Sequence, residues 1–330
     1  ELKNLGVLKW EKNIYWDKYF NTNIELDNER IFLFMDNNIE AYRIISGADS
    51  WKYSFEDKNT SIVLANVKYG NHIIFIKKNT PDVQSFYFED KLAGRTIDFE
   101  DFKKETKYHI VEMDKRDSKI ILDEPTDIPG ESDIVWMDVN NNKIIIQSII
   151  RKKMFISTYD ISDGKLLWKI SRDISNFYLS YDLKPVFYNG NLLLPLENQI
   201  EYIDENGNTI KVYSNKDMEA IITFNENSIQ NNTMIFIIED INYEYVIVDL
   251  DSFTKIAGGS LDIENPKRGY LANNMFVDIS SSGSITAYNF NVDNKNEAAL
   301  LWDNDYYSSL ELVADNNKNI YLLDKDNNYI

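Results

Sequence analysis

The stretch TYDISDGKLLW, Thr158–Trp168, contains a Tyr, a Gly five residues later and a Trp four residues after that Gly. An earlier stretch, AYRIISGADSW, places Tyr42, Gly47 and Trp51 at the same spacing. A sparse spacing that recurs far along a chain is typical of a repeated structural unit. We therefore expect the whole chain to consist of copies of one unit.

The recurring unit reads as a β-hairpin. Runs rich in Ile, Val, Phe and Tyr alternate with short turns rich in Asn, Asp and Gly, and such runs favour strands. The hairpin segments are residues 27–44, 141–161, 189–208, 231–250, 273–290 and 317–328. One short helix is predicted, DFEDFKKETK, Asp98–Lys107. The sequence therefore predicts an all-β fold.

The position of the Trp in the opening phrase, here called the mark position, sets the length of the repeat. Marks fall 38 to 46 residues apart, except for one interval of 71 residues, when the last copy is completed from the start of the chain. They lie at Trp10, Trp51, Leu122, Trp168, Lys211, Ala257 and Trp302. Repeats of this length with four strands each, A to D, are typical of a β-propeller. We predict one propeller domain over residues 1–330 with seven four-stranded blades, and eight blades as the alternative.

The two ends of the chain carry the halves of one copy. The last copy stops at Ile330 before its mark, whereas GVLKW, Gly6–Trp10, parallels GKLLW, Gly164–Trp168. Open sheet edges invite unwanted pairing, so a propeller is expected to close. We expect the N-terminal strand to pair with the C-terminal blade, near Asn319–Leu323, and so to close the ring.

The 71-residue interval contains an insertion at about residues 80–107. A strand ends at Asn79 and the next begins at Tyr108, with TPDVQSFYFEDKLAGRTIDFEDFKKETK between them. Long loops of this kind are often functional. The insertion is interpreted as a docking arm, a lid over the central channel or an extended hairpin, and a hidden eighth blade stays open.

The phrase Ala/Thr-Tyr-x4-Gly-x3-Trp resembles the repeat of quinoprotein-like propellers. That repeat is shared by pyrroloquinoline-quinone dehydrogenases and by the lipoprotein scaffold of the bacterial outer-membrane barrel-assembly machinery. The resemblance implies that the repeat Trp side chains wedge between blades, and it implies no cofactor. The repeat residues are Gly6, Gly47, Gly164, Trp10, Trp51, Trp168 and Trp302. The dehydrogenases usually carry a vicinal cysteine pair and a calcium site, and this chain is shorter and has no cysteine.

The composition excludes several classes of site and partner. A formal charge of -19 disfavours nucleic acid, whose phosphates need clustered Lys and Arg. Zero cysteines exclude disulfides and thiolate chemistry, and there are only two histidines, His72 and His109. No apolar run reaches the roughly 20 residues of a membrane helix. We expect an exported protein, periplasmic or at the cell surface, whose signal or lipid anchor has been removed from the N-terminus.

No cofactor and no metal site are predicted. Three acidic stretches, residues 138–143, 204–208 and 324–328, superficially resemble calcium loops but lack the twelve-residue pattern ending in Glu. They fall at repeat turns, where Asp and Asn form backbone hydrogen bonds. His72 and His109 begin two strands of one blade, so we expect them to be neighbours with a structural role.

Candidate binding residues lie in segments that follow the D strands and in the insertion, where aromatic and acidic residues mix. B–C turns and D–A connections emerge on the same face of a propeller, and exposed aromatic residues are typical of binding hot spots. The candidates are Tyr15, Trp16, Asp17, Tyr19, Phe86, Tyr87, Phe88, Tyr178, Tyr306 and Tyr307. The alternative is that these residues only cover blade edges.

The predicted function is a non-catalytic binding or scaffold module for a protein, peptide or glycan. No nucleophile–base constellation is evident in the sequence, whereas the predicted loop face is suited to contact. The alternative is a propeller enzyme with carboxylates at the channel mouth, such as a quinone- or calcium-dependent oxidoreductase, a glycosidase or a lyase. A surface adhesin or lipoprotein of unknown ligand is a third hypothesis. Fold alone does not decide among them.

Overall fold

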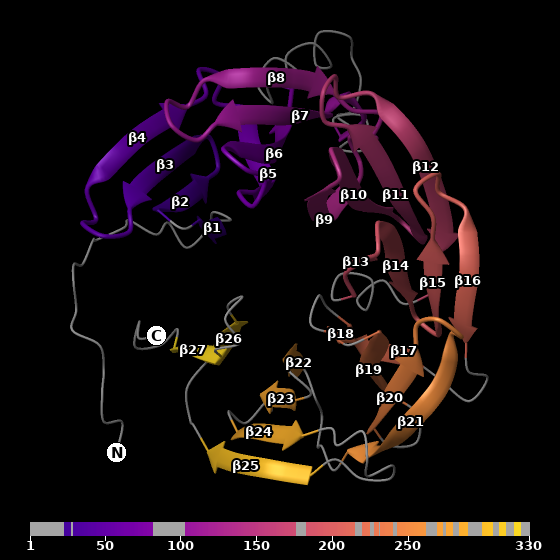
Figure 1. Cartoon of the computed structure of the whole chain (residues 1–330). Helices are drawn as coiled ribbons and strands as arrows, with labels where there is room; N and C mark the ends of the chain where they lie inside the picture. The colour runs from indigo at the N-terminus through magenta and orange to yellow at the C-terminus, as the bar shows by residue number, and fades with distance from the viewer. Residues whose placement is uncertain are drawn as a thin grey trace, which may run out of the picture. The chain divides into compact units, whose positions relative to one another are not determined.

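The chain was studied as a computed structural model, and its strands are labelled in Figure 1. The structure describes residues 23–27, 29–81, 103–175, 183–214, 220–224, 228–230, 232–239, 243–261, 269–272, 275–279, 284–289, 299–305, 310–314 and 320–324. The chain divides into two compact units, Glu1–Arg172 and Asp173–Ile330. Each unit is described by itself.

The first unit contains three four-stranded antiparallel sheets. Their strand orders are β1-β2-β3-β4, β5-β6-β7-β8 and β12-β11-β10-β9. The strands are β1 (Asn23–Leu26), β2 (Arg30–Met35), β3 (Asn38–Arg43), β4 (Asp49–Ser54), β5 (Thr60–Asn66), β6 (His72–Asn79), β7 (Lys107–Asp114), β8 (Ile120–Pro125), β9 (Asp133–Asn140), β10 (Lys143–Ile150), β11 (Lys153–Asp160) and β12 (Leu166–Asp173).

The described part of the second unit continues the same pattern. Its sheets run β13-β14-β15-β16, β17-β19-β20-β21 with β18 paired to β19, β22-β23-β24-β25, and β26-β27. The strands are β13 (Val186–Tyr188), β14 (Asn191–Leu196), β15 (Gln199–Ile203), β16 (Thr209–Ser214), β17 (Ala220–Thr223), β18 (Ile229–Gln230), β19 (Thr233–Glu239), β20 (Tyr243–Asp249), β21 (Thr254–Leu261), β22 (Gly269–Ala272), β23 (Met275–Ile279), β24 (Ser284–Asn289), β25 (Ala299–Asp305), β26 (Leu310–Ala314) and β27 (Ile320–Asp324).

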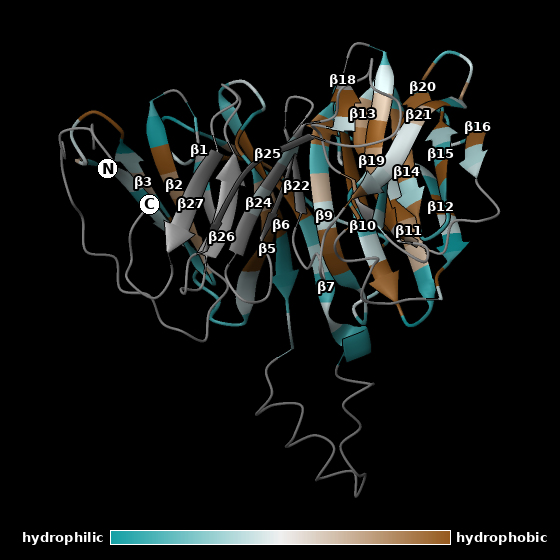
Figure 2. Ribbon diagram, turned by 90° about the horizontal axis from the view of Figure 1, so that it is seen from below, coloured by the Kyte–Doolittle hydropathy of each residue, from teal (hydrophilic) through white to brown (hydrophobic). Residues whose placement is uncertain are grey.

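The all-β prediction and its four-strand unit are confirmed. Each four-stranded sheet is an antiparallel meander in which consecutive strands pair, as the A-B-C-D assignment requires, whereas in the sheet that contains β18 the first strand, β17, pairs with β19. The middle strands are buried on both faces, which explains why they are continuous apolar runs: in KIIIQSII of β10, residues 144–149 are all buried. Figure 2 shows the same apolar character on β19 and β20.

In the first unit, the sheets pack face to face through two apolar clusters. One contains Phe32 and Ile39 from the first sheet and Phe75 and Val111 from the second. The opposite face of the second sheet contributes Ile74 to a cluster with residues of the third sheet. Successive residues of β6 therefore point into different cores, which is the consequence of strand alternation.

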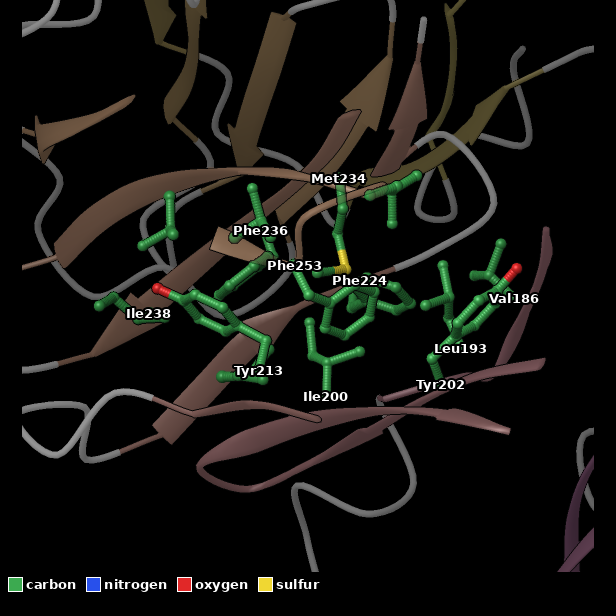
Figure 3. Close-up of a cluster of buried hydrophobic side chains, with 14 of the residues drawn as sticks. Val186, Leu193, Ile200, Tyr202, Tyr213, Phe224, Met234, Phe236, Ile238 and Phe253 are labelled. Carbon is green, nitrogen blue, oxygen red and sulfur yellow. The ribbon is translucent and has the colours of Figure 1, made fainter. Parts of the chain in front are cut away.

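The second unit is built the same way (Figure 3). Leu193 and Tyr202 of one sheet meet Met234 and Phe236 of the next in one cluster. The other face of that second sheet, with Tyr245 fully buried, packs against Tyr288 of β24. A sheet with two apolar faces needs a neighbour on both sides, so these sheets cannot be stable alone.

The backbone register supports the counting of the repeat. In five sheets the mark residue is paired with the last residue before a β-bulge. The pairs are Trp51 with Ala41, Leu122 with Glu112, Lys211 with Tyr202, Ala257 with Ile247 and Trp302 with Ala287. The extra residues that delay Trp302 in the sequence therefore do not displace it from its position in the sheet.

The Gly of the opening phrase occupies a left-handed backbone position. Gly47 (φ 63°) donates its N–H to the carbonyl of Arg43, and Gly164 (φ 67°) donates to that of Asp160. Ser118 and Phe253 take the equivalent place in other C–D turns, with φ of 59° and 56°. Gly is the least strained residue there, but it is not required, so only some copies keep it.

The acidic turns that superficially resemble calcium loops are turns by their geometry. Asn141 (φ 48°) and Asn142 (φ 59°) both have positive φ, as a type I′ hairpin turn requires. Asp204 accepts hydrogen bonds from the backbone N–H groups of Asn206 (2.9 Å) and Asn208 (2.8 Å). The turn interpretation is confirmed for residues 138–143 and 204–208, and most of 324–328 lies outside the described residues.

Two predictions need correction. Only residues 103–105 of the expected helix Asp98–Lys107 are helical among those described, because Lys107 already begins β7. His72 and His109 are not neighbours. His72 is paired with Asp114 and His109 with Lys77, since the starts of two antiparallel strands lie at opposite ends of a hairpin.

Candidate binding site

The aromatic and acidic binding candidates lie outside the described residues. This applies to Tyr15, Trp16, Asp17, Tyr19, Phe86, Tyr87, Phe88, Tyr178, Tyr306 and Tyr307. Gly6 and Trp10 of the proposed closing strand also lie outside them. The structure describes the two ends of the insertion and the neighbouring connections.

The insertion leaves and re-enters the second sheet at adjacent positions. Asn79, the last residue of β6, is paired with Lys107, the first residue of β7. The N–H of Thr80 donates to the carbonyl of Asn59 at 3.0 Å, which holds the outgoing chain against the sheet. The described parts of the 71-residue interval therefore build one four-stranded sheet, and the two ends of the insertion lie side by side at Asn79 and Lys107.

The D–A connection after β8 packs directly on the returning end of the insertion. A Cβ placed on Gly130 would lie 2.1 Å from the carbonyl oxygen of Lys103 and 2.4 Å from that of Thr106. The Tyr108 hydroxyl donates to the carbonyl of Ser132 at 2.6 Å. A B–C insertion and a D–A connection thus share one face of the first unit.

The mark residues connect neighbouring sheets. The indole Nε1 of Trp51 donates to the carbonyl of Lys115, in the C–D turn of the next sheet, at 2.6 Å. Lys211 makes the equivalent contact in the second unit, because its Nζ lies 2.5 Å from the carbonyl oxygen of Asp251. Trp168 is partly buried on β12. Trp302 is described only by its backbone pairing with Ala287.

A hollow of about 540 Å³ lies where the end of β8 meets the start of β12. At the mark position of β8, Leu122 stands where other copies of the repeat have Trp. Gly164 allows the C–D turn to approach β8 closely, since a Cβ on Gly164 would lie 2.7 Å from Cβ of Glu124. The residues that line this β8–β12 hollow are Glu124, Pro125, Thr126, Asp127, Tyr159, Asp163, Gly164, Lys165 and Leu166.

Hydrogen bonds fix the inner wall of the β8–β12 hollow. The Tyr159 hydroxyl donates to Asp127, whose other oxygen accepts from Lys169 Nζ at 2.8 Å. Burial raises the pKa of Tyr159, and the hydrogen bond to Asp127 adds to this shift. Burial opposes ionisation of Asp127, but the hydrogen bonds from Lys169 and Tyr159 outweigh it and lower the pKa of Asp127.

On the outer wall of the hollow, one of the two carboxylates, that of Glu124, has no side-chain hydrogen bond within the described part of the chain. Asp163 is paired with Lys165 at 2.5 Å. The Glu124 side chain is exposed and interacts electrostatically with Lys165. Leu166, one of the lining residues, is 42% exposed, and Ile121 on β8 (50%) and Leu167 on β12 (47%) are exposed on the same two strands. A mixed acidic and aliphatic concavity is suited to contact with a partner, and the aromatic pattern of the loops gave no indication of it.

Other titratable groups serve cross-strand pairs. Asp123 accepts from Lys77 Nζ at 2.5 Å and pairs with His109 Nδ1 at 2.9 Å, and His72 contacts Glu112. Burial opposes ionisation of Asp123, but the contacts with His109 and Lys77 lower its pKa. Within the described ranges, no group of three or more His, Asp or Glu residues is arranged to hold a metal ion.

No helix in the part of the chain that the structure describes is long and apolar enough to cross a membrane.

Comparison with solved structures supports a β-propeller-like fold. The chain is similar to BamB from Moraxella catarrhalis, a β-propeller, with a TM-score of 0.55 and 12% identity over 92% of this chain and 82% of that chain. The computationally designed Ika8 protein aligns with a TM-score of 0.46 and 9% identity over 91% of this chain and 94% of that chain. No protein-family model and no curated protein matches the chain.

Proposed function

We propose that this chain is a non-catalytic propeller scaffold that binds a protein, peptide or glycan on its loop face. The loop face is the side that carries the B–C turns and the D–A connections. The packing of Gly130 against Lys103 and Thr106 carries this proposal, because it brings a D–A connection against the base of the long insertion. The likeness to BamB supports the scaffold interpretation at the level of fold.

The finer features belong to the same proposal. The propeller has seven four-stranded blades, with eight as the alternative, forms one domain over residues 1–330 and belongs to the quinoprotein-like family. It is exported to the periplasm or the cell surface. Its partner contacts the aromatic residues of the insertion and of the D–A connections, with Trp16 and Tyr87 among them.

The enzyme alternative would need carboxylates free to act on a substrate. Several described carboxylates are instead engaged in ion pairs. Asp114 binds Arg116, Asp123 binds Lys77 and Asp127 binds Lys169. These pairs have a structural use, which favours the scaffold over the enzyme.

The test is a deletion within the insertion that preserves its paired ends, Asn79 and Lys107. Residues 82–102 are replaced by a four-residue turn, and the variant and the full chain are immobilised at equal density for capture of envelope proteins. We expect an unchanged urea midpoint and loss of the captured partner. Trp16→Ala is expected to weaken binding by about 2 kcal/mol if Trp16 is a buried anchor. Unfolding of the deletion variant would indicate a hidden eighth blade, and unchanged capture would place the partner on another surface.

A further inference from the structure

We infer that the β8–β12 hollow is a second interaction surface, which takes a Lys or Arg side chain from an extended, otherwise aliphatic segment of a partner protein. The hollow lies where two outer strands meet. None of its lining residues is among the aromatic and acidic residues that the proposed function uses.

Charge complementarity decides the class of side chain. Of the three carboxylates in the lining, Asp127 is held by Lys169 and Tyr159, and Asp163 is held by Lys165. Glu124 also lines the hollow, is exposed and interacts electrostatically with Lys165, whose Nζ is hydrogen-bonded to Asp163. A cation placed beside Glu124 would gain a charge-assisted hydrogen bond at an already concave site.

The aliphatic surroundings indicate what flanks the cation. Leu166 lines the hollow, and Ile121 and Leu167 are about half exposed on the two strands that meet there. Leu166 therefore adds an exposed aliphatic side chain to the acidic lining. A segment that alternates basic and aliphatic residues would place a basic side chain in the hollow and an aliphatic one on Leu166.

The strand edge indicates that the segment is extended. β12 is the terminal strand of the sheet β12-β11-β10-β9, and it spans eight residues. The backbone groups on its outer side are therefore available to a further strand, as in β-strand addition. Backbone pairing supplies affinity in this mode, and the hollow supplies selectivity for the basic side chain.

The test uses a fluorescein-labelled eight-residue peptide of alternating Arg and Val, followed by fluorescence anisotropy on the full chain. The matched peptide has Glu in place of Arg. We expect saturable binding of the Arg peptide, weakened by salt, and none of the Glu peptide. Glu124→Gln should weaken binding about three- to tenfold, and Leu166→Ser should also weaken it.

Two control variants separate the hollow from the general acidity of the chain. Glu29→Gln removes the same charge at an exposed position in the β1–β2 turn, and Ile45→Ser removes an 85% exposed aliphatic side chain. Both should bind the Arg peptide like the original chain. Equal weakening by Glu124→Gln and Glu29→Gln would mean diffuse attraction and would overturn the inference, as would equal binding of both peptides or no binding of either.

Discussion

At the residue scale, Gly164 serves two purposes at once. Its φ of 67° is a conformation that side chains with a Cβ adopt at a cost, and its missing side chain leaves room for Glu124. Gly70 has a similar φ of 51°, but a Cβ added to it would meet no atom within 4 Å. Substitution of Gly70 therefore measures the cost of backbone strain alone, whereas substitution of Gly164 measures the cost of strain together with a steric clash.

Gly70→Ala is expected to lower the free energy of unfolding by about 1–2 kcal/mol, because only the left-handed conformation is penalised. Gly164→Ala is expected to cost about 1–3 kcal/mol more, since its Cβ also collides with Glu124. Urea unfolding of both variants measures the difference. Equal losses would show that β8 moves away freely and that the contact with Gly164 is not tight.

Acid stability also depends on single residues in the C–D turns. Asp114 accepts hydrogen bonds from the side chain and the backbone N–H of Arg116, and these lower the pKa of Asp114 to about 2. The pKa of Asp160 is lowered by the hydroxyl and the backbone N–H of Ser162. A carboxylate whose pKa is lowered by folding stabilises the fold above its unfolded pKa, and this stability is lost as pH falls.

The free energy of unfolding is therefore expected to fall between about pH 4, near the unfolded pKa of Asp, and pH 2. Asp114→Asn should flatten this part of the pH profile, because Asn does not titrate. Urea midpoints at intervals between pH 2 and pH 7 measure the slope. An unchanged slope in the variant would mean that Asp114 contributes nothing to acid sensitivity.

At the scale of elements, the D strand of one sheet and the C–D turn of the next form a recurring junction. Trp51 and Lys211 both donate to a backbone carbonyl of that turn, although one is an indole and the other an ammonium group. Lys211 also lies 5.7 Å above the ring of Phe253, which is stacked on Tyr202. The contact is kept while the residue type changes.

Trp51→Phe and Lys211→Met each remove the donor and keep most of the apolar body. Each is expected to destabilise its unit by about 1–3 kcal/mol, because a turn carbonyl loses its partner. Lys58→Met, at an exposed position, is the control and should change stability by less than about 0.5 kcal/mol. Thermal unfolding measures all three, and a Lys211 loss no larger than that of Lys58 would contradict the shared role.

At the scale of the whole molecule, closure of the ring is the open prediction. Within the described residues, β26 and β27 form a two-stranded sheet, and β27 has β26 as its partner. A two-stranded ribbon is marginal alone, and every other sheet among the described residues has four or five strands. The strand Gly6–Trp10 is the proposed completion.

Removal of residues 1–10 is expected to expose a sheet edge and to lower the free energy of unfolding by about 3–5 kcal/mol, the usual cost of losing a packed Trp. Differential scanning calorimetry and light scattering measure stability and association. The matched control is Trp10→Ala in the full chain, which should reproduce most of the loss of stability without the association. A truncated chain that stays monomeric with an unchanged melting temperature would contradict the closure.

The sequence by itself determined the strands, their order and the length of the repeat. These follow from local rules: apolar runs between Asn/Asp/Gly turns favour hairpins, and in five sheets the mark residue, Trp51 among them, is paired next to the same kind of bulge. The positions of β6 and β7 on either side of the insertion were predicted to within one residue.

Only the tertiary structure decided which residues meet. It placed His72 and His109 at opposite ends of a hairpin. It gave Lys211 the same kind of contact with a C–D turn that Trp51 makes in the first unit. It formed the β8–β12 hollow from Glu124 and Asp127 on one side and Tyr159 and Gly164 on the other. Such contacts join residues that are far apart along the chain. Their geometry depends on how sheets pack and not on local preference, and for that reason local sequence patterns do not contain it.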